Sequence, residues 1–311
     1  MIRNRRNAKR TLSSTIAAIV VACVLAPVLA HAQEGGIKLF SRQTALGGRT
    51  QTAIIIVGYV KDAASVERLM DMVAQRGNEV YAQLDWQNPG GDVGRLNAAA
   101  GGSAVAVSDD TIAAFEEARR ISDWTKGWFD VAAAGQGSYK DINVDKGART
   151  VQLKKSGMQA RFDGMLEGFL AEYMTRLIAT ANMQNAMVKV GNVFRAIGSR
   201  PDGPWKIQVQ DSEGTFAHHA LNLQVNNNAV ATVSSSEFSS QELINPRNKE
   251  RIAPPCKGVT LVMPNAAEAQ GAAKAVFIAG PKDGYDLLGK IGKASGLIVD
   301  NQGKFIRTPG F

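Results

Sequence analysis

Glycines, carboxylates and aromatic residues are clustered in one short segment of the second half of the chain, Asp163-Gly164-Met165-Leu166-Glu167-Gly168-Phe169. Apolar residues at helical spacing follow, so the segment is expected to begin a helix. Glycines let a backbone approach a dinucleotide closely, and N–H groups at a helix start can hold phosphate oxygens. Asp163 and Glu167 would suit the helix dipole but repel a phosphate. The segment is therefore either a phosphate site or an ordinary helix start with acidic residues in its first turn.

Other short motifs occur around this segment in a fixed order. Before it come residues 92–97 and Thr125-Lys126-Gly127-Trp128-Phe129-Asp130. After it come Val190-Gly191-Asn192, Pro204-Trp205, Ala231-Thr232, Glu242-Leu243-Ile244-Asn245-Pro246, and Gln270 with Lys274. Over roughly residues 45–297, this ordered series resembles the FAD:protein FMN transferase (ApbE) family.

The resemblance implies a fold, a reaction and a set of binding residues. The fold would be α+β, T-fold-like, with mostly antiparallel sheets, packed helices and two intimately associated lobes. The reaction would transfer FMN from FAD to a threonine or serine of an exported flavoprotein, with Mg²⁺ as the metal. The cofactor-binding positions would be Trp128, Phe129, Asp130, Glu167, Gly168, Phe169, Gly191, Asn192 and Thr232. The residues themselves also allow a plainer interpretation of the loop at 125–130, with Asp130 in a turn and Trp128 and Phe129 in the core.

The reactive positions depart from the family pattern. Glu242 stands in place of a histidine, and it could act as a general base only if burial raised its pKa. Glu167 replaces a lysine. Gln270 and Lys274, four residues apart on one expected helical face, replace the aspartate and threonine that supply oxygen ligands to Mg²⁺. They form no credible metal site, although the Lys274 ammonium could neutralise a pyrophosphate or pair with Glu167 or Glu242. A surface glutamate and an exposed lysine are the simpler interpretations of Glu242 and Lys274.

The N-terminus has the pattern of a bacterial export signal. Five basic side chains within residues 3–10 precede an apolar stretch at residues 16–29, and Ala30-His31-Ala32 fits an A-x-A cleavage site. The apolar stretch contains a proline and is shorter than the roughly 20 residues of a spanning helix. We predict cleavage after Ala32, which would leave residues 33–311 as a single periplasmic or otherwise exported domain. Membrane attachment through an uncleaved signal or lipidation is the alternative.

Most of the positive charge belongs to this predicted signal. Removal of residues 1–32 lowers the formal net charge from +8 to +3. No basic stripe with interleaved aromatic residues remains, so a nucleic acid is not a predicted partner. Cys256 would be the single remaining cysteine, and an internal disulfide is therefore excluded.

Apolar periodicity predicts clusters of strands and helices without strict alternation. Ser108 is expected to cap a helix whose apolar face includes Ile112 and Phe115. Strands are expected at 52–60, 186–190, 205–209, 221–225, 258–263 and 297–299, and helices at 63–75, 166–181, 266–278 and 285–291. This order favours an α+β fold with a mostly antiparallel sheet over a doubly wound fold.

Three functional hypotheses follow. The first is an active transferase, which the overall resemblance supports. The second is a non-catalytic periplasmic protein that keeps the scaffold to bind flavin or dock a partner. The third is metal-free transfer with Glu242 as base and Lys274 as electrophile. Several replaced positions in one site remove base, metal and phosphate clamp together, which favours the second hypothesis.

Overall fold

The computed structural model describes residues 36–209, 221–238 and 243–311, and these residues belong to one compact unit. The predicted export signal and Glu242 lie outside the described residues. Within the part that is described, no helix combines the length and the apolar character needed to cross a bilayer.

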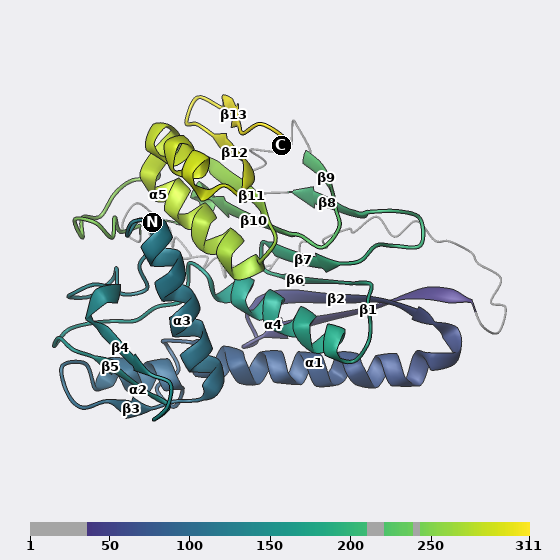
Figure 1. The fold of residues 1–311 in the computed structure, drawn as a ribbon, viewed down its shortest axis with the longest axis horizontal. Helices are drawn as coiled ribbons and strands as arrows, with labels where there is room; N and C mark the ends of the chain where they lie inside the picture. Colours follow the sequence, from purple (N-terminus) through teal and green to yellow (C-terminus); the bar gives the residue numbers. More distant parts are fainter. Residues whose placement is uncertain (1–35, 210–220, 239–242) are drawn as a thin grey trace, which may run out of the picture. The chain divides into compact units, whose positions relative to one another are not determined.

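An eight-stranded sheet forms the centre of this unit, and every neighbouring pair of its strands is antiparallel (Figure 1). In spatial order the strands are β1 (Ile37–Leu46), β2 (Thr50–Tyr59), β6 (Ala186–Val190), β7 (Val193–Ile197), β10 (Ala229–Ser234), β11 (Gly258–Met263), β12 (Ser295–Val299) and β13 (Phe305–Arg307). The predicted antiparallel α+β class is confirmed.

Three long helices cover one face of this sheet: α1 (Ala63–Leu84), α4 (Leu166–Thr180) and α5 (Ala266–Ile291) (Figure 1). They bury a shared apolar core, to which α4 contributes Leu170 and Met174. The helix α4 contacts both α1 and α5. The helix α4 is therefore held between two other helices and the sheet.

The opposite face of the sheet is covered in part by a two-stranded sheet, β8 (Trp205–Val209) and β9 (Leu221–Val225). Trp205 and Ile207 of this ribbon pack with Met187 and Leu297 of the large sheet in a second, smaller core. The Pro204-Trp205 motif therefore serves packing, because the indole ring is 1% exposed.

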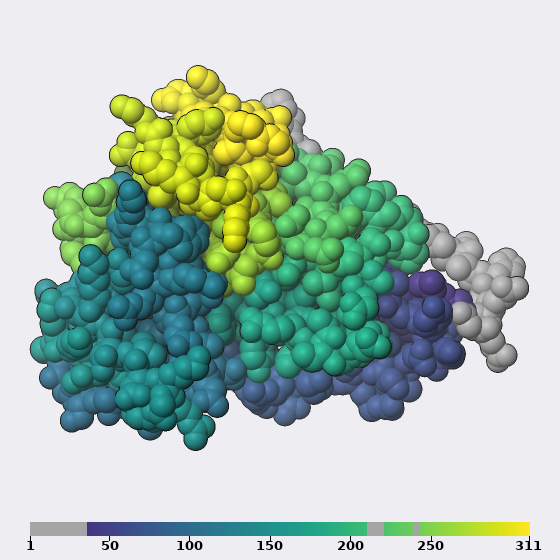
Figure 2. All heavy atoms as spheres, in the orientation of Figure 1, coloured from purple at the N-terminus to yellow at the C-terminus, as the bar shows by residue number. Residues whose placement is uncertain are grey.

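The remaining elements are α2 (Asp92–Ala98), α3 (Asp109–Trp124) and a three-stranded sheet of β3 (Val105–Ala106), β5 (Thr150–Leu153) and β4 (Ile142–Asp145). Ser108 caps α3 as predicted, because its Oγ accepts the Thr111 N–H at 3.2 Å. The buried Asp92 carboxylate accepts the Ser108 N–H at 2.8 Å and so joins α2 to the cap of α3. In the space-filling view α3 lies against α5 (Figure 2).

The helices differ from their predicted lengths in two places. The helix expected at 63–75 continues to Leu84 as α1. In this added part, Gly77 lets Met174 of α4 approach closely. The two helices expected at 266–278 and 285–291 are joined in α5 by a kink at Gly280 (φ 80°), followed by Pro281. The long strand β1 was not predicted. It is an edge strand paired only with β2, so its apolar pattern is weak.

Candidate functional site

Residues 163–169, expected to be either a phosphate site or an ordinary helix start, lead into α4 and form its first turn from Leu166, against which Gln270 of α5 packs. The Gln270 Oε1 accepts the Gly168 N–H at 2.8 Å, and its Nε2 donates to the Glu167 carboxylate at 3.3 Å. Gln270 is 6% exposed. Gly168 is needed for packing, since a Cβ there would collide with the Ala266 carbonyl of α5. The amide that could hold an anion is thus already paired within the chain.

The second glycine motif is a tight hairpin between β6 and β7. Val190 pairs with Val193, so Gly191 and Asn192 are the two turn residues, and Gly191 has φ +54° as such turns favour. The Gly191 N–H donates to the Gln51 carbonyl at 2.9 Å. The Asn192 N–H donates to Glu167 Oε2 at 3.3 Å. The glycine also makes room for that carboxylate, with which a Cβ would collide.

Glu237 extends this network on the other side of the hairpin. Its Oε1 accepts from Asn192 Nδ2 at 3.0 Å and from the Ser234 N–H at 3.1 Å. Glu237 ends a short 3₁₀ helix, η4 (Ser235–Glu237), with Ser234 in a capping box. Sequence reasoning missed Glu237, although the Ser-x-x-Glu spacing of residues 234–237 is the known signature of this cap.

Lys274 lies one helical turn after Gln270 on α5. Its Nζ is 3.4 Å from the centroid of the Phe238 ring, a cation–π contact. Burial lowers the pKa of Lys274 to about 8, against the attraction of Glu237 and Asp163. Its aliphatic stem passes Gly164, where a Cβ would lie 3.3 Å from the Lys274 Cγ. The ammonium thus contacts an aromatic ring and is attracted by carboxylates of the chain itself.

The Glu167 carboxyl has a raised pKa. Burial raises the pKa of Glu167 to about 7, and repulsion from Glu237 acts in the same direction. The Asn192 N–H and Lys189 oppose this shift. A carboxyl group that holds a proton near neutral pH repels its neighbours less, which suits two acids that both bond to Asn192, Glu167 through the N–H and Glu237 through Nδ2.

The loop at residues 125–130 is a structured turn. Asp130 accepts the Ala132 N–H at 2.7 Å and the Tyr139 N–H at 3.2 Å. Burial raises the pKa of Asp130, although these two hydrogen bonds oppose the change. The Trp128 ring is covered by the Arg247 guanidinium at 4.8 Å from its centroid.

Three other predicted cofactor contacts are core residues. Phe129 is 4% and Phe169 is 7% exposed, and both belong to the main core. The Thr232 hydroxyl is buried and lies 3.0 Å from the Thr260 hydroxyl on the neighbouring strand. The structure therefore brings Glu167, Gly168, Gly191, Asn192 and Gln270 together in one network, with Lys274 beside it, and places these two rings and Thr232 in packing positions.

The residues do not fit the Mg²⁺ ion that the resemblance implies. The Gln270 oxygen is taken by the Gly168 N–H. A protonated Lys274 has no lone pair to donate and would repel a cation. Nowhere in residues 36–209, 221–238 and 243–311 are three or more His, Cys, Asp or Glu side chains placed to hold a metal.

The residues do not fit a bound pyrophosphate either. A Cβ at Gly164 would meet Phe129 at 3.1 Å, and the space at Gly168 and Gly191 is used by Ala266 and Glu167. The three glycines therefore accommodate the chain's own atoms and leave no cradle for a dinucleotide backbone.

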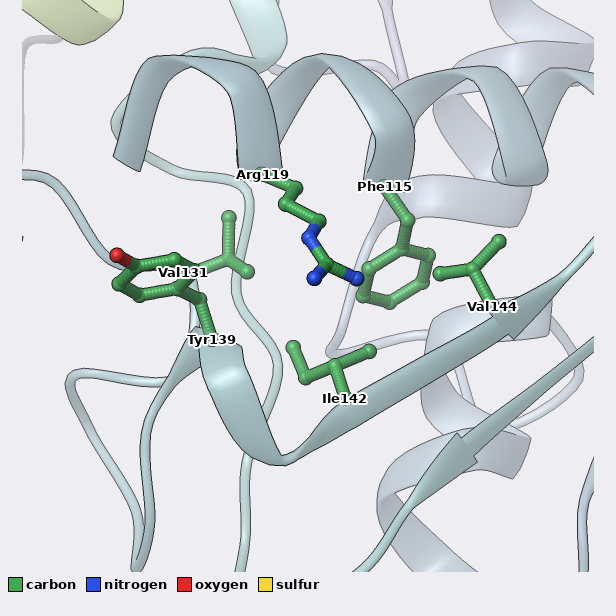
Figure 3. Close-up of a pocket in the computed structure, with 6 residues that line it drawn as sticks. All are labelled: Phe115, Arg119, Val131, Tyr139, Ile142 and Val144. Carbon is green, nitrogen blue, oxygen red and sulfur yellow. The ribbon is translucent and has the colours of Figure 1, made fainter. Parts of the chain in front are cut away.

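A small cavity between α3 and the three-stranded sheet is also unsuited to a ligand (Figure 3). Its volume is about 10 Å³, which is near the minimum for one water molecule. Figure 3 shows Arg119 extending from α3 between Tyr139 and Phe115, over Ile142. This cavity is a packing gap.

The fold is that of the known flavin transferases. The structure of the flavin transferase ApbE from Vibrio cholerae superimposes with a TM-score of 0.74 at 17% sequence identity, covering 89% of this chain and 99% of that one. Among curated relatives, the FAD:protein FMN transferase of Treponema pallidum is 22% identical over 282 residues, 76% of this chain and 77% of that protein. The FAD:protein FMN transferase of Haemophilus influenzae is 21% identical over 305 residues, 84% and 88% of the two chains.

The model of the ApbE family matches residues 49–138 and 132–298. This chain therefore belongs to the ApbE family, and the resemblance inferred from the motifs is confirmed.

Proposed function

We propose that this chain is an exported, non-catalytic member of the ApbE family, which uses the transferase fold as a scaffold for binding a partner. One observation carries the proposed lack of catalysis: polar groups at the expected cofactor-binding and metal positions bond to one another. The Gln270 side chain accepts a hydrogen bond from the Gly168 N–H at 2.8 Å, and the Glu167 carboxylate accepts one from the Asn192 N–H at 3.3 Å.

This pairing matters because transfer of FMN needs charge stabilisation at the pyrophosphate. A metal ion or cationic clamp supplies that stabilisation in phosphoryl transfer. Here the corresponding region carries the carboxylates of Glu167 and Glu237, and its cation, Lys274, is already near Glu237. A phosphate would have to displace internal hydrogen bonds and approach two acids.

The test is a transfer assay with purified protein, FAD, Mg²⁺ and an exported flavoprotein acceptor. The Vibrio cholerae flavin transferase serves as the positive control. We expect no covalent flavin fluorescence on the acceptor and no AMP above the enzyme-free reaction. Any flavinylated product above the enzyme-free reaction would refute the proposal, and loss of that product on addition of a chelator would show that the transfer depends on a metal.

Metal-free transfer is the second candidate, with Glu242 as base and Lys274 as electrophile. The half-buried Lys274 side chain beside the start of α4 supports it. This candidate requires that flavinylated product still forms in the presence of a chelator. It also requires that the transfer rate falls at least about tenfold in both Glu242→Gln and Lys274→Met, because each variant loses one charged contact.

Export is tested separately by mass spectrometry of protein recovered from the periplasm of a Gram-negative host. We expect the first residue to be Gln33, as the A-x-A pattern at residues 30–32 predicts. Recovery of intact chain from the cytoplasm alone would contradict this prediction.

A further inference from the structure

A second cavity, which has a polar lining, lies outside the network described above. Its volume is about 340 Å³, which falls within the range of small-molecule sites. Its polar side chains are Gln136, Gln159, Lys249 and Arg251, and the backbone of residues 133–135 and Gly157 completes the lining with Ile244. None of these residues belongs to the predicted flavin or metal positions. We call this cavity the basic pocket.

One wall of the basic pocket is made by residues 133–136 and 157–159. The Gln136 N–H donates to the Gly157 carbonyl at 3.0 Å and holds the two segments together. Gly135 lies so close to the second segment that a Cβ would collide with the Gln159 N–H group. This wall is therefore set by backbone contacts and does not depend on the polar side chains that face the pocket.

The other wall is the loop at residues 244–251, which is closed on itself. Ile244 forms a β-bridge with Arg251, and the Asn245 N–H donates to the Glu250 carbonyl at 2.8 Å. Lys249 attaches the loop to the first wall, since its Nζ donates to the Ala132 carbonyl at 2.9 Å. The two walls are thus fixed relative to each other by a hydrogen bond.

The charge of the lining has one sign. Lys249 and Arg251 are its ionisable side chains, and both are cations. Asp130 and Asp141 attract Lys249 from outside the pocket, and Asp141 also pairs with Lys155 at 2.9 Å. Within the described part of the chain, the Arg251 guanidinium makes no ion pair and the Gln136 amide no hydrogen bond. Both side chains are exposed, so their donors are open to solvent at the mouth of the pocket and free to meet an anion there.

We propose that the basic pocket binds an oxyanion, the carboxylate or phosphate group of a small polar ligand. A guanidinium offers two parallel N–H donors that match either group, and amide side chains add neutral donors beside it. Lys249 contributes positive charge while its hydrogen bond keeps the loop in place. The inference goes beyond the proposed scaffold function and does not depend on it.

The test is isothermal titration of the purified protein with inorganic phosphate and, separately, with succinate, each at an ionic strength held constant with sodium chloride. We expect saturable binding of at least one anion. Binding of phosphate alone supports a phosphate ligand, and binding of succinate alone supports a carboxylate ligand. Absence of saturable binding for both anions overturns the proposal.

Two variants and one control locate the site. Arg251→Gln and Gln136→Glu are expected to weaken binding at least about tenfold, through a lost charge-assisted bond and through added repulsion respectively. Arg68→Gln, which makes the same charge change at an exposed position of α1, is expected to leave the affinity within about twofold. Equal affinities in all four proteins would overturn the assignment. If Arg251→Gln does not fold by circular dichroism, the exposed Gln136→Glu variant decides.

Discussion

Gln270 on α5 accepts the backbone N–H of Gly168 on α4 at 2.8 Å. This bond joins two helices at the point where a bound anion would meet the start of α4. The same side chain donates to Glu167, so one amide satisfies a backbone donor and a carboxylate together. The family resemblance leads one to expect a metal ligand at position 270. In this chain, Gln270 instead connects two helices.

Gln270→Leu should therefore destabilise the fold. Leucine keeps much of the volume but leaves the buried Gly168 N–H without an acceptor, a loss of about 1–3 kcal/mol in the free energy of unfolding. Urea unfolding measures the change, with Gln43→Leu on the exposed edge strand β1 as the control. Equal stability of the two variants would mean that water replaces the lost acceptor at no cost.

Gly191→Ala tests whether the hairpin glycine is needed for the Glu167 carboxylate. Gly48 is the matched control, because it has φ +68° and open space where a Cβ would lie, whereas at Gly191 (φ +54°) the Cβ meets Glu167. Gly48→Ala should lose about 1–2 kcal/mol from backbone strain alone. Gly191→Ala should lose a further 1–3 kcal/mol, roughly, from overpacking. The excess should vanish in a Glu167→Ala background, and its persistence there would point to another cause.

Glu167 should make stability fall as pH rises. Its pKa is about 7 in the folded protein against 4.5 for the ordinary group, so the folded state holds this proton more tightly. The favourable contribution is fully present below pH 4.5 and is lost as pH rises through about 7. Relative to Glu167→Gln, the native protein should lose up to about 3 kcal/mol across that window. Urea unfolding at several pH values measures it, with the exposed Glu116→Gln as control. Parallel curves for the native protein and Glu167→Gln would contradict the assignment.

The predicted elements that proved right are those whose signal is local. Apolar spacing located α4 and β6 almost to the residue, because α4 buries one face along its length and β6 is a short apolar run buried on both faces of the sheet. The edge strand β1 and the order of the sheet depend on pairing between distant segments, which periodicity does not encode. The site divides in the same way. The residue types at 167, 270 and 274 predicted that Mg²⁺ would not bind there. The hydrogen bond between Gln270 and Gly168 could not be predicted from the sequence, because the two residues are 102 positions apart and only the fold brings them together.

Magnesium should leave the native protein unchanged and stabilise a variant with oxygen ligands restored. In Gln270→Asp/Lys274→Thr the cation Lys274 is removed and the Gln270 amide becomes a carboxylate, four residues from a hydroxyl on the same face of α5. Binding to the folded state alone then adds about 1.4 kcal/mol when Mg²⁺ is at ten times its dissociation constant. Thermal unfolding with and without Mg²⁺, at an ionic strength matched with sodium chloride, measures the effect. The single variant Gln270→Asp, which keeps the repelling ammonium, should respond less than the double variant. A rise in the midpoint of the native protein itself would show that Mg²⁺ binds despite Lys274, and the conclusion that these residues do not fit the ion would be wrong.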